Sequence, residues 1–397
     1  MKTLPRALAN QPAVQPEEQD FSAEVWRSLR FLLIITTLLI AFGLTMLYSA
    51  SYGTAGLKYF KNQLIWIGIG GAGAAAVFLT GYKKIASKSL LWMVISFILL
   101  VIASTCFAPV NGATRWIRIG GFSIQPSEFA KLAVAIFVAK YCSDNIRTFA
   151  RIRHRRGLLP LGAGVVLVTG GILMGHDLGT TILVGCMAFA TMLAAGLYFR
   201  YLIIPLSLAG VIAVYIKLFD PMRLARVTSF MNPEAVQQGK GYQLWNSLLA
   251  LGSGNWFGVG FMTSRLKAKY LPEAHTDFIL SIVGEELGFV SMTLLIVLYT
   301  LYGFFALKIS MRSNTKLGML LGFAVTVGIV LQAAINLAVV SGSAPTKGMP
   351  APFISYGGSN LIACMLATAL LVSIAVDTLA PEYNRSIIEK LPWNRKK

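Results

Sequence analysis

The chain has 397 residues, of which 56% are hydrophobic and 13% charged, and its mean hydropathy is +0.67. Soluble domains average roughly 45–50% apolar and about 25% charged residues, so this composition excludes an ordinary soluble globule. The 35 Lys and Arg against 16 Asp and Glu give a net charge of +19, which indicates either orientation in a membrane or nucleic-acid binding.

The apolar residues are gathered into long stretches. Residues 1–30 contain no apolar run, so we expect a disordered cytoplasmic tail without a cleavable signal peptide. A helix needs roughly 20 apolar residues to cross a hydrocarbon core of about 30 Å. The stretches predicted to span the membrane are 31–50, 64–80, 90–108, 126–142, 158–174, 180–197, 202–218, 278–305, 319–340 and 361–379.

Basic residues fall in every second loop between these stretches. With the amino terminus inside, one side collects Lys83, Lys84, Lys88, Arg147, Arg151, Arg153, Arg155, Arg156, Arg200, Lys308, Arg312 and Lys316. Because these loops are short, the positive-inside rule places both termini in the cytoplasm and argues against a nucleic-acid partner. The sequence therefore predicts an all-α polytopic membrane domain of ten transmembrane helices over residues 31–379, followed by a basic cytoplasmic tail over 380–397.

The opposite side carries long segments that topology alone does not require. The largest is an extracytoplasmic loop over residues 219–277, between the seventh and eighth predicted spans. Loops of that length are uncommon unless they are functional. Within it Tyr242, Trp245, Leu248 and Leu249 share one helical face, which predicts an interfacial helix. We expect any chemistry on this side.

Another outer segment carries cations where positive charge is normally depleted. Arg115, Trp116 and Arg118 precede a predicted helix start, and Glu128 and Lys131 stand on one face of that helix. One interpretation is a local ion pair with a Trp at the membrane interface. The other is that Arg115, Arg118 and Lys131 face an anionic headgroup.

Acidic residues mark the outer ends of several spans. Asp177 precedes the sixth span, where an Asp commonly caps a helix, and a functional role is equally open. Asp277 follows His275 at the start of the eighth span, and Glu285 and Glu286 come shortly after it. They lie about 12–13 Å further along the helix, so they need a polar cavity or cationic partners.

The last outer loop, residues 345–360, is rich in proline and glycine. Lys347 and Ser355 are its candidate binding side chains. Gly357 and Gly358 would let backbone N–H groups near a helix start converge on an anion such as phosphate. An ordinary turn with a Ser cap is the alternative.

Together these segments resemble the SEDS family (shape, elongation, division and sporulation) of bacterial peptidoglycan polymerases across residues 31–379. They resemble its division branch, FtsW, more than its elongation branch, RodA. The resemblance implies transfer of a growing glycan from undecaprenyl pyrophosphate to the 4-hydroxyl of the GlcNAc of lipid II. It places the essential loop carboxylate on Asp277. The family's other motif positions fall on Arg115, Trp116, Glu128, Lys131 and Asp177.

This chemistry needs one base and several cations. A pyrophosphate leaving group needs cations or metal more than a general acid, so Asp277 can serve as the base. We expect Arg115, Arg118, Lys131 and Lys347 to face the pyrophosphate, and Glu285 and Glu286 to support the site. The other predicted binding residues are Trp116, Glu128, Asp177, His275, Ser355, Gly357 and Gly358. No cofactor is assigned with certainty, and a divalent cation, Mg²⁺ or Mn²⁺, is left open.

The resemblance also implies partners and a location. A class B penicillin-binding protein would cross-link the strands, alongside other division proteins and membrane lipids, in the cytoplasmic (inner) membrane at the septum. Two other functions stay open: a lipid II flippase, with Glu285 and Glu286 as a relay, and a division scaffold. Functional groups on one side favour the enzyme over alternating access.

Overall fold

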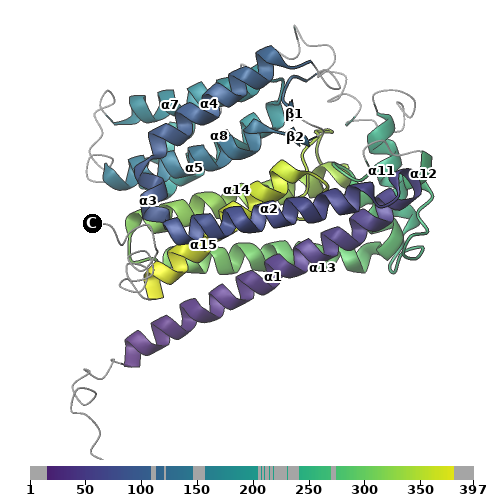
Figure 1. Cartoon of the computed structure of the whole chain (residues 1–397), viewed down its shortest axis with the longest axis horizontal. Helices are drawn as coiled ribbons and strands as arrows, with labels where there is room; N and C mark the ends of the chain where they lie inside the picture. Colours follow the sequence, from purple (N-terminus) through teal and green to yellow (C-terminus); the bar gives the residue numbers. More distant parts are fainter. Residues whose placement is uncertain are drawn as a thin grey trace, which may run out of the picture.

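The computed structural model describes residues 16–108, 113–119, 122–145, 157–203, 241–269 and 274–379, with isolated positions between 204 and 240. Its long helices lie side by side (Figure 1). The first helix group comprises α1 (Pro16–Ala55), α2 (Lys58–Thr80), α13 (Ile279–Met311), α14 (Lys316–Val340) and α15 (Gly358–Leu379). The second helix group comprises α4 (Ser89–Cys106), α5 (Pro126–Asp144), α7 (Leu158–Met174) and α8 (Leu178–Ala194).

Short elements occupy the two ends of this bundle. At one end, which we call the hairpin end, lie β1 (Ile117–Ile119), β2 (Phe122–Ile124), α11 (Tyr242–Ser253) and α12 (Leu266–Lys269) (Figure 1). The opposite end, the α3 end, carries α3 (Tyr82–Ser87). A short 3-10 helix, η2 (Phe199–Leu202), follows α8.

Within the described residues, six helices are long and apolar enough to cross a membrane: Phe21–Gly53, Lys58–Thr80, Ser89–Cys106, Ile279–Met311, Lys316–Val340 and Gly358–Leu379. The predicted spans at 126–142, 158–174 and 180–197 coincide with helices α5, α7 and α8. The predicted span at 202–218 lies outside the described residues except for isolated positions. The number of ten spans and their orientation stay predictions.

The outer faces of these helices are apolar. On α4, Leu90, Val94, Ile98 and Ile102 are all exposed, and their spacing of four places them on one side of the helix. Such a continuous apolar surface is rare on soluble proteins, whereas helices with internally satisfied backbones suit lipid. The chain is an integral membrane protein.

The first helix begins earlier than predicted. The expectation of a disordered tail up to residue 30 is wrong for residues 16–30, because α1 starts at Pro16. Val25, Leu29 and Leu32 are buried at helical spacing, and α1 packs against α13. Glu24 reaches Lys308 at 2.7 Å. Residues 1–15 and 380–397 lie outside the described residues.

The predicted interfacial helix is present as α11, but it turns a different face to the protein. Its buried residues include Leu244, Ser247 and Ala250, whereas the predicted face contains Leu249, which is exposed. The Ser247 hydroxyl donates to the Val340 carbonyl oxygen at 2.8 Å, so α11 is anchored to the end of α14.

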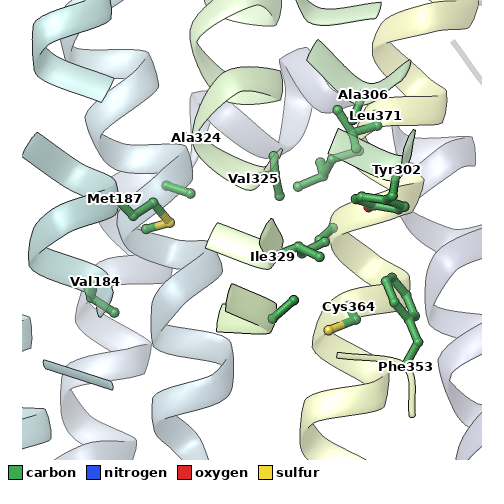
Figure 2. Packing of buried hydrophobic residues seen from close by; sticks show 14 of the residues in the cluster. Val184, Met187, Tyr302, Ala306, Ala324, Val325, Ile329, Phe353, Cys364 and Leu371 are labelled. Carbon is green, nitrogen blue, oxygen red and sulfur yellow. The ribbon is translucent and has the colours of Figure 1, made fainter. Parts of the chain in front are cut away.

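The core joins the two helix groups, because α14 contacts both α5 and α8. Its packing between the groups is shown in Figure 2, where the labelled side chains are Val184, Met187, Tyr302, Ala306, Ala324, Val325, Ile329, Phe353, Cys364 and Leu371. This layer fixes how the helix groups lie relative to each other.

A polar cluster closes the α3 end. Asp377 accepts from the Tyr82 hydroxyl at 3.0 Å and from Lys83 Nζ at 2.8 Å. Burial raises the pKa of Tyr82 above its usual range, so the phenol stays protonated and can donate at neutral pH. The cluster ties α3 to the end of α15.

Candidate active site

A cavity of about 380 Å³ opens at the hairpin end. Its lining comes from α2, the β1–β2 hairpin, the turn before α13, the loop before α15 and the first turn of α15. The residues are Tyr59, Asn62, Trp66, Arg115, Trp116, Arg118, Ser123, Gln125, His275, Thr276, Asp277, Gly348, Pro350, Tyr356, Gly357, Gly358, Ser359 and Asn360. Of the predicted site residues, the cavity gathers Arg115, Trp116, Arg118, His275, Asp277, Gly357 and Gly358.

Asp277 and Arg115 meet across Gly348. A Cβ atom added to Gly348 would lie 2.6 Å from Asp277 Oδ2 and 3.4 Å from an Arg115 terminal nitrogen. The carboxylate and the guanidinium therefore flank the same backbone atom. Asn336 Nδ2 on α14 donates to the carbonyl oxygen of Asp277 at 3.0 Å and to that of Met349 at 2.6 Å. This asparagine joins the turn of Asp277 to the loop of Gly348.

Asp177 forms an ion pair with Arg115. Its carboxylate caps α8 by accepting from the Thr180 backbone N–H at 3.2 Å, which confirms the capping interpretation. It also accepts from Gln125 Nε2 at 3.1 Å and lies 3.7 Å from Arg115 Nη1. Asp177 does not line the cavity, so it orients a residue that does.

Arg118 is presented by a hairpin that the sequence analysis missed. β1 and β2 pair antiparallel, with Arg118 opposite Ser123, and both residues line the cavity. The signal was present in the sequence, because apolar residues alternate in the two short runs Ile117–Ile119 and Phe122–Ile124 around a Gly-Gly pair.

Aromatic side chains form another wall. The rings of Tyr59 and His275 stack with centroids 4.4 Å apart, and Tyr59 meets Tyr356 edge-on at 4.8 Å. The Tyr356 backbone N–H donates to the His275 carbonyl oxygen at 3.0 Å. Tyr59 and Asn62 were missed because the second span was predicted from residue 64, whereas α2 begins at Lys58. Trp66 lies within the predicted span, where an aromatic residue carries no signal of a binding role.

Glu128 and Lys131 lie away from this cavity. Lys131 Nζ is 2.7 Å from Glu128 and 2.5 Å from Gln332 Oε1. Both charged side chains are buried and line a separate void of about 30 Å³ among α5, α8, α14 and α15. The predicted ion pair is confirmed. This position does not support direct contact of Lys131 with a ligand in the larger cavity.

Lys347 and Ser355 also stand outside the lining. The stem of Lys347 lies beside Gly179 at the start of α8. The buried Ser355 hydroxyl accepts from the Ala351 backbone N–H at 2.8 Å, and therefore stabilises the loop that carries Pro350.

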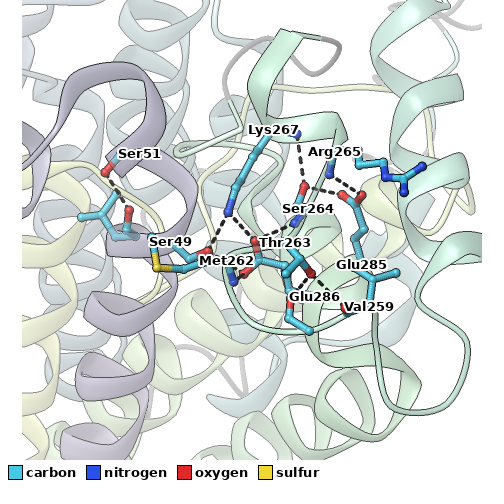
Figure 3. A network of polar contacts seen from close by, with 12 residues as sticks. Ser49, Ser51, Val259, Met262, Thr263, Ser264, Arg265, Lys267, Glu285 and Glu286 are labelled. Atoms are coloured by element: carbon cyan, nitrogen blue, oxygen red, sulfur yellow. Dashed lines mark hydrogen bonds and ion pairs between the residues drawn. The ribbon is translucent and has the colours of Figure 1, made fainter.

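Glu285 and Glu286 belong to a different network (Figure 3). Glu286 accepts from Lys267 Nζ at 2.6 Å and from Ser49 Oγ at 2.5 Å, which confirms the predicted cationic partner for this acid. Glu285 accepts from the Arg265 backbone N–H at 2.9 Å and from the Ser264 hydroxyl. Both carboxylates are buried and clamp the segment 262–267 onto α13, outside the cavity.

Replacing Glu286 by alanine is expected to destabilise the protein by about 3 kcal/mol, because Lys267 would keep a mostly buried charge without its carboxylate. Thermal unfolding in detergent measures this loss. Glu24→Ala is the control, since its ion pairs are more exposed and its loss should change stability much less. A Glu286→Ala protein of parental stability but without activity would instead place this acid in the chemistry.

The comparisons with known proteins each match most of the chain. The model of the cell cycle protein family named for FtsW, RodA and SpoVE matches residues 29–379. The chain is 34% identical over 359 residues to a probable peptidoglycan glycosyltransferase FtsW of Trichlorobacter lovleyi, covering 88% of this chain and 94% of that protein. It is 37% identical over 358 residues to stage V sporulation protein E of Bacillus subtilis, covering 87% and 96%.

Solved structures show the same fold. A chain from a study of polymerization and crosslinking by a peptidoglycan synthase complex superposes with a TM-score of 0.74 at 24% identity, covering 87% of this chain and 97% of that one. Rod shape determining protein RodA of Thermus thermophilus gives a TM-score of 0.65 at 24% identity, covering 87% and 96%.

Proposed function

The chain belongs to the FtsW/RodA/SpoVE family, and from this premise we propose that it is a peptidoglycan glycosyltransferase that polymerises lipid II. The observation that carries the proposal is the meeting of Asp277 and Arg115 across Gly348 within a cavity of about 380 Å³. One carboxylate beside a cation is the pair that transfer from a pyrophosphate carrier requires. The curated relatives named as glycosyltransferases support the same reaction class.

In this mechanism Asp277 is the general base. It accepts the proton of the GlcNAc 4-hydroxyl as that oxygen attacks the anomeric carbon of the growing glycan. The bond to the undecaprenyl pyrophosphate breaks, and the pyrophosphate leaves with the bonding electrons. Arg115 and Arg118 neutralise its charge, aided by the partial positive charge at the start of α15.

A divalent cation, Mg²⁺ or Mn²⁺, stays an untested prediction. Mg²⁺ is usually held by one or two carboxylates together with substrate phosphates. Asp277 is the one carboxylate among the described residues that line the cavity, so it would have to serve both the ion and the attacking hydroxyl. The steps proposed here therefore rest on Arg115, Arg118 and Asp277.

The proposed setting is the bacterial cytoplasmic membrane at the division septum, with both termini in the cytoplasm and the hairpin end outside. A class B penicillin-binding protein is the proposed partner, because a polymerase leaves its strands to be cross-linked. No observation now favours the flippase, since the acids that suggested a relay, Glu285 and Glu286, clamp the segment 262–267.

Purified protein incubated with labelled lipid II is expected to form glycan strands, alone or with its cognate class B penicillin-binding protein. Gel separation of the products measures strand formation, and a parallel reaction with EDTA tests the divalent cation. Headgroup translocation in protein-only vesicles without polymer would support the flippase instead. Intact division in cells after acid-to-amide changes around the cavity would support the scaffold.

A further inference from the structure

Two buried side chains, Gln332 and Asn360, connect the Glu128–Lys131 ion pair to the cavity. Lys131 on α5 lies 2.5 Å from Gln332 Oε1 on α14. Gln332 Nε2 in turn lies 2.9 Å from Asn360 Oδ1 on α15 and 2.8 Å from the Pro350 carbonyl oxygen. Asn360 lines the cavity, so a charge outside the lining is linked to an amide within it.

The direction of this series of hydrogen bonds follows from which groups can donate and which can accept. An ammonium group can only donate, so it takes the oxygen of the Gln332 amide. A carbonyl oxygen can only accept, so the Gln332 amino group must face Pro350. The same amino group also meets Asn360, which therefore presents its oxygen. Neither amide can be reversed without placing donor against donor or oxygen against oxygen.

This order commits the oxygen of Asn360 to Gln332 and leaves its amino group over. Asn360 is 3% exposed, and its Nδ2 has no hydrogen-bond partner among the described residues. A buried donor without a partner is costly, so it marks a place where a ligand oxygen fits. Because Arg115 and Arg118 line the same cavity and α15 begins there, the fitting oxygen is that of an anion.

We propose that Asn360 Nδ2 donates to a phosphate oxygen of the lipid-linked pyrophosphate, and that Lys131 and Gln332 are positioning residues for this donor. The proposal rests on the proposed function, because it names a contact of the same substrate. Lys131 then acts on the ligand without touching it. Its positive charge fixes which way two amides point.

The test measures binding of radiolabelled undecaprenyl pyrophosphate and of the uncharged undecaprenol to the full chain in nanodiscs. Asn360→Leu removes the donor at similar volume. Gln332→Glu keeps the volume but reverses the order of the hydrogen bonds. A carboxylate at residue 332 can only accept, so Asn360 must turn its amino group toward it. Each variant is expected to bind the pyrophosphate about tenfold or more weakly and undecaprenol unchanged.

Asn246→Leu is the matched control, since Asn246 is buried on α11 outside the cavity lining and should keep parental selectivity. If Asn360→Leu does not fold, Asn360→Asp replaces the donor by a carboxylate and should lower pyrophosphate affinity further. Parental selectivity in folded Asn360 and Gln332 variants would overturn the proposal and leave the proposed function standing. Equal binding of both lipids by the parental protein would overturn both.

Discussion

Asp277→Asn is expected to lower the rate of glycan polymerisation by about 10²–10⁴-fold, the usual contribution of a positioned general base. Asparagine keeps the shape of the side chain. It also leaves the backbone carbonyl oxygen that Asn336 binds, so the turn before α13 should stay intact. The side chain loses its negative charge beside Arg115 and, with it, the ability to take the proton. Strand formation from labelled lipid II, measured at equal amounts of folded protein, gives the rate.

Asp377→Asn is the matched control for this experiment. Asp377 is a buried carboxylate that binds Tyr82 and Lys83 at the α3 end, far from the cavity lining. The control should lower thermal stability and leave polymerisation near the parental rate. A parental rate for Asp277→Asn would remove the base assignment, and an equal loss in both variants would point to a structural effect.

Gly348→Ala is expected to reduce polymerisation by about 10²-fold or more with little loss of folding. The added methyl would stand 2.6 Å from Asp277 Oδ2, which no carbon–oxygen contact tolerates, so the carboxylate must shift from its present position beside Gly348. A displacement of about 1 Å in a reacting group costs roughly that factor. Initial rates with lipid II, compared with thermal unfolding, separate the two effects.

Gly185→Ala serves as the comparison. A Cβ at Gly185 on α8 meets nothing within 4 Å, and alanine is favoured over glycine inside a helix. This variant should match or exceed parental stability and keep parental activity. A Gly348→Ala enzyme with unchanged rate would mean that the carboxylate is free to shift without consequence for the reaction.

Features set by neighbouring residues were predictable from the sequence. The start of α5 at Pro126, the Glu128–Lys131 pair and the Asp177 cap all depend on contacts within one helical turn. The β-hairpin was equally local and could have been found from its alternation around the Gly-Gly pair. The early start of α1 was missed because its apolar residues are too sparse to resemble a span, and their burial depends on packing against distant helices such as α13.

Contacts between distant segments could not be predicted. Nothing in the sequence near Glu286 indicates that Lys267 and Ser49 supply its partners. Likewise, the sequence places Lys131 at an outer helix start, where contact with a headgroup is reasonable. Only the packing of α5 against α14 shows that the Lys131 ammonium group donates to the Gln332 side-chain oxygen. The neighbourhood of Asp277 and Gly348 depends in the same way on Asn336 of α14.

The cavity wall draws on both helix groups. Arg115 belongs to the segment that leads into the second helix group through α5, and Asp277 to the turn that leads into the first through α13. Their separation is therefore a global property of the bundle. Val325 and Ile329 lie in the interior layer of Figure 2. Replacing either by a larger or smaller residue is expected to change the separation of Arg115 and Asp277, and with it the reaction rate. Directed evolution for altered turnover should accordingly find solutions in this interior layer as well as beside the substrate.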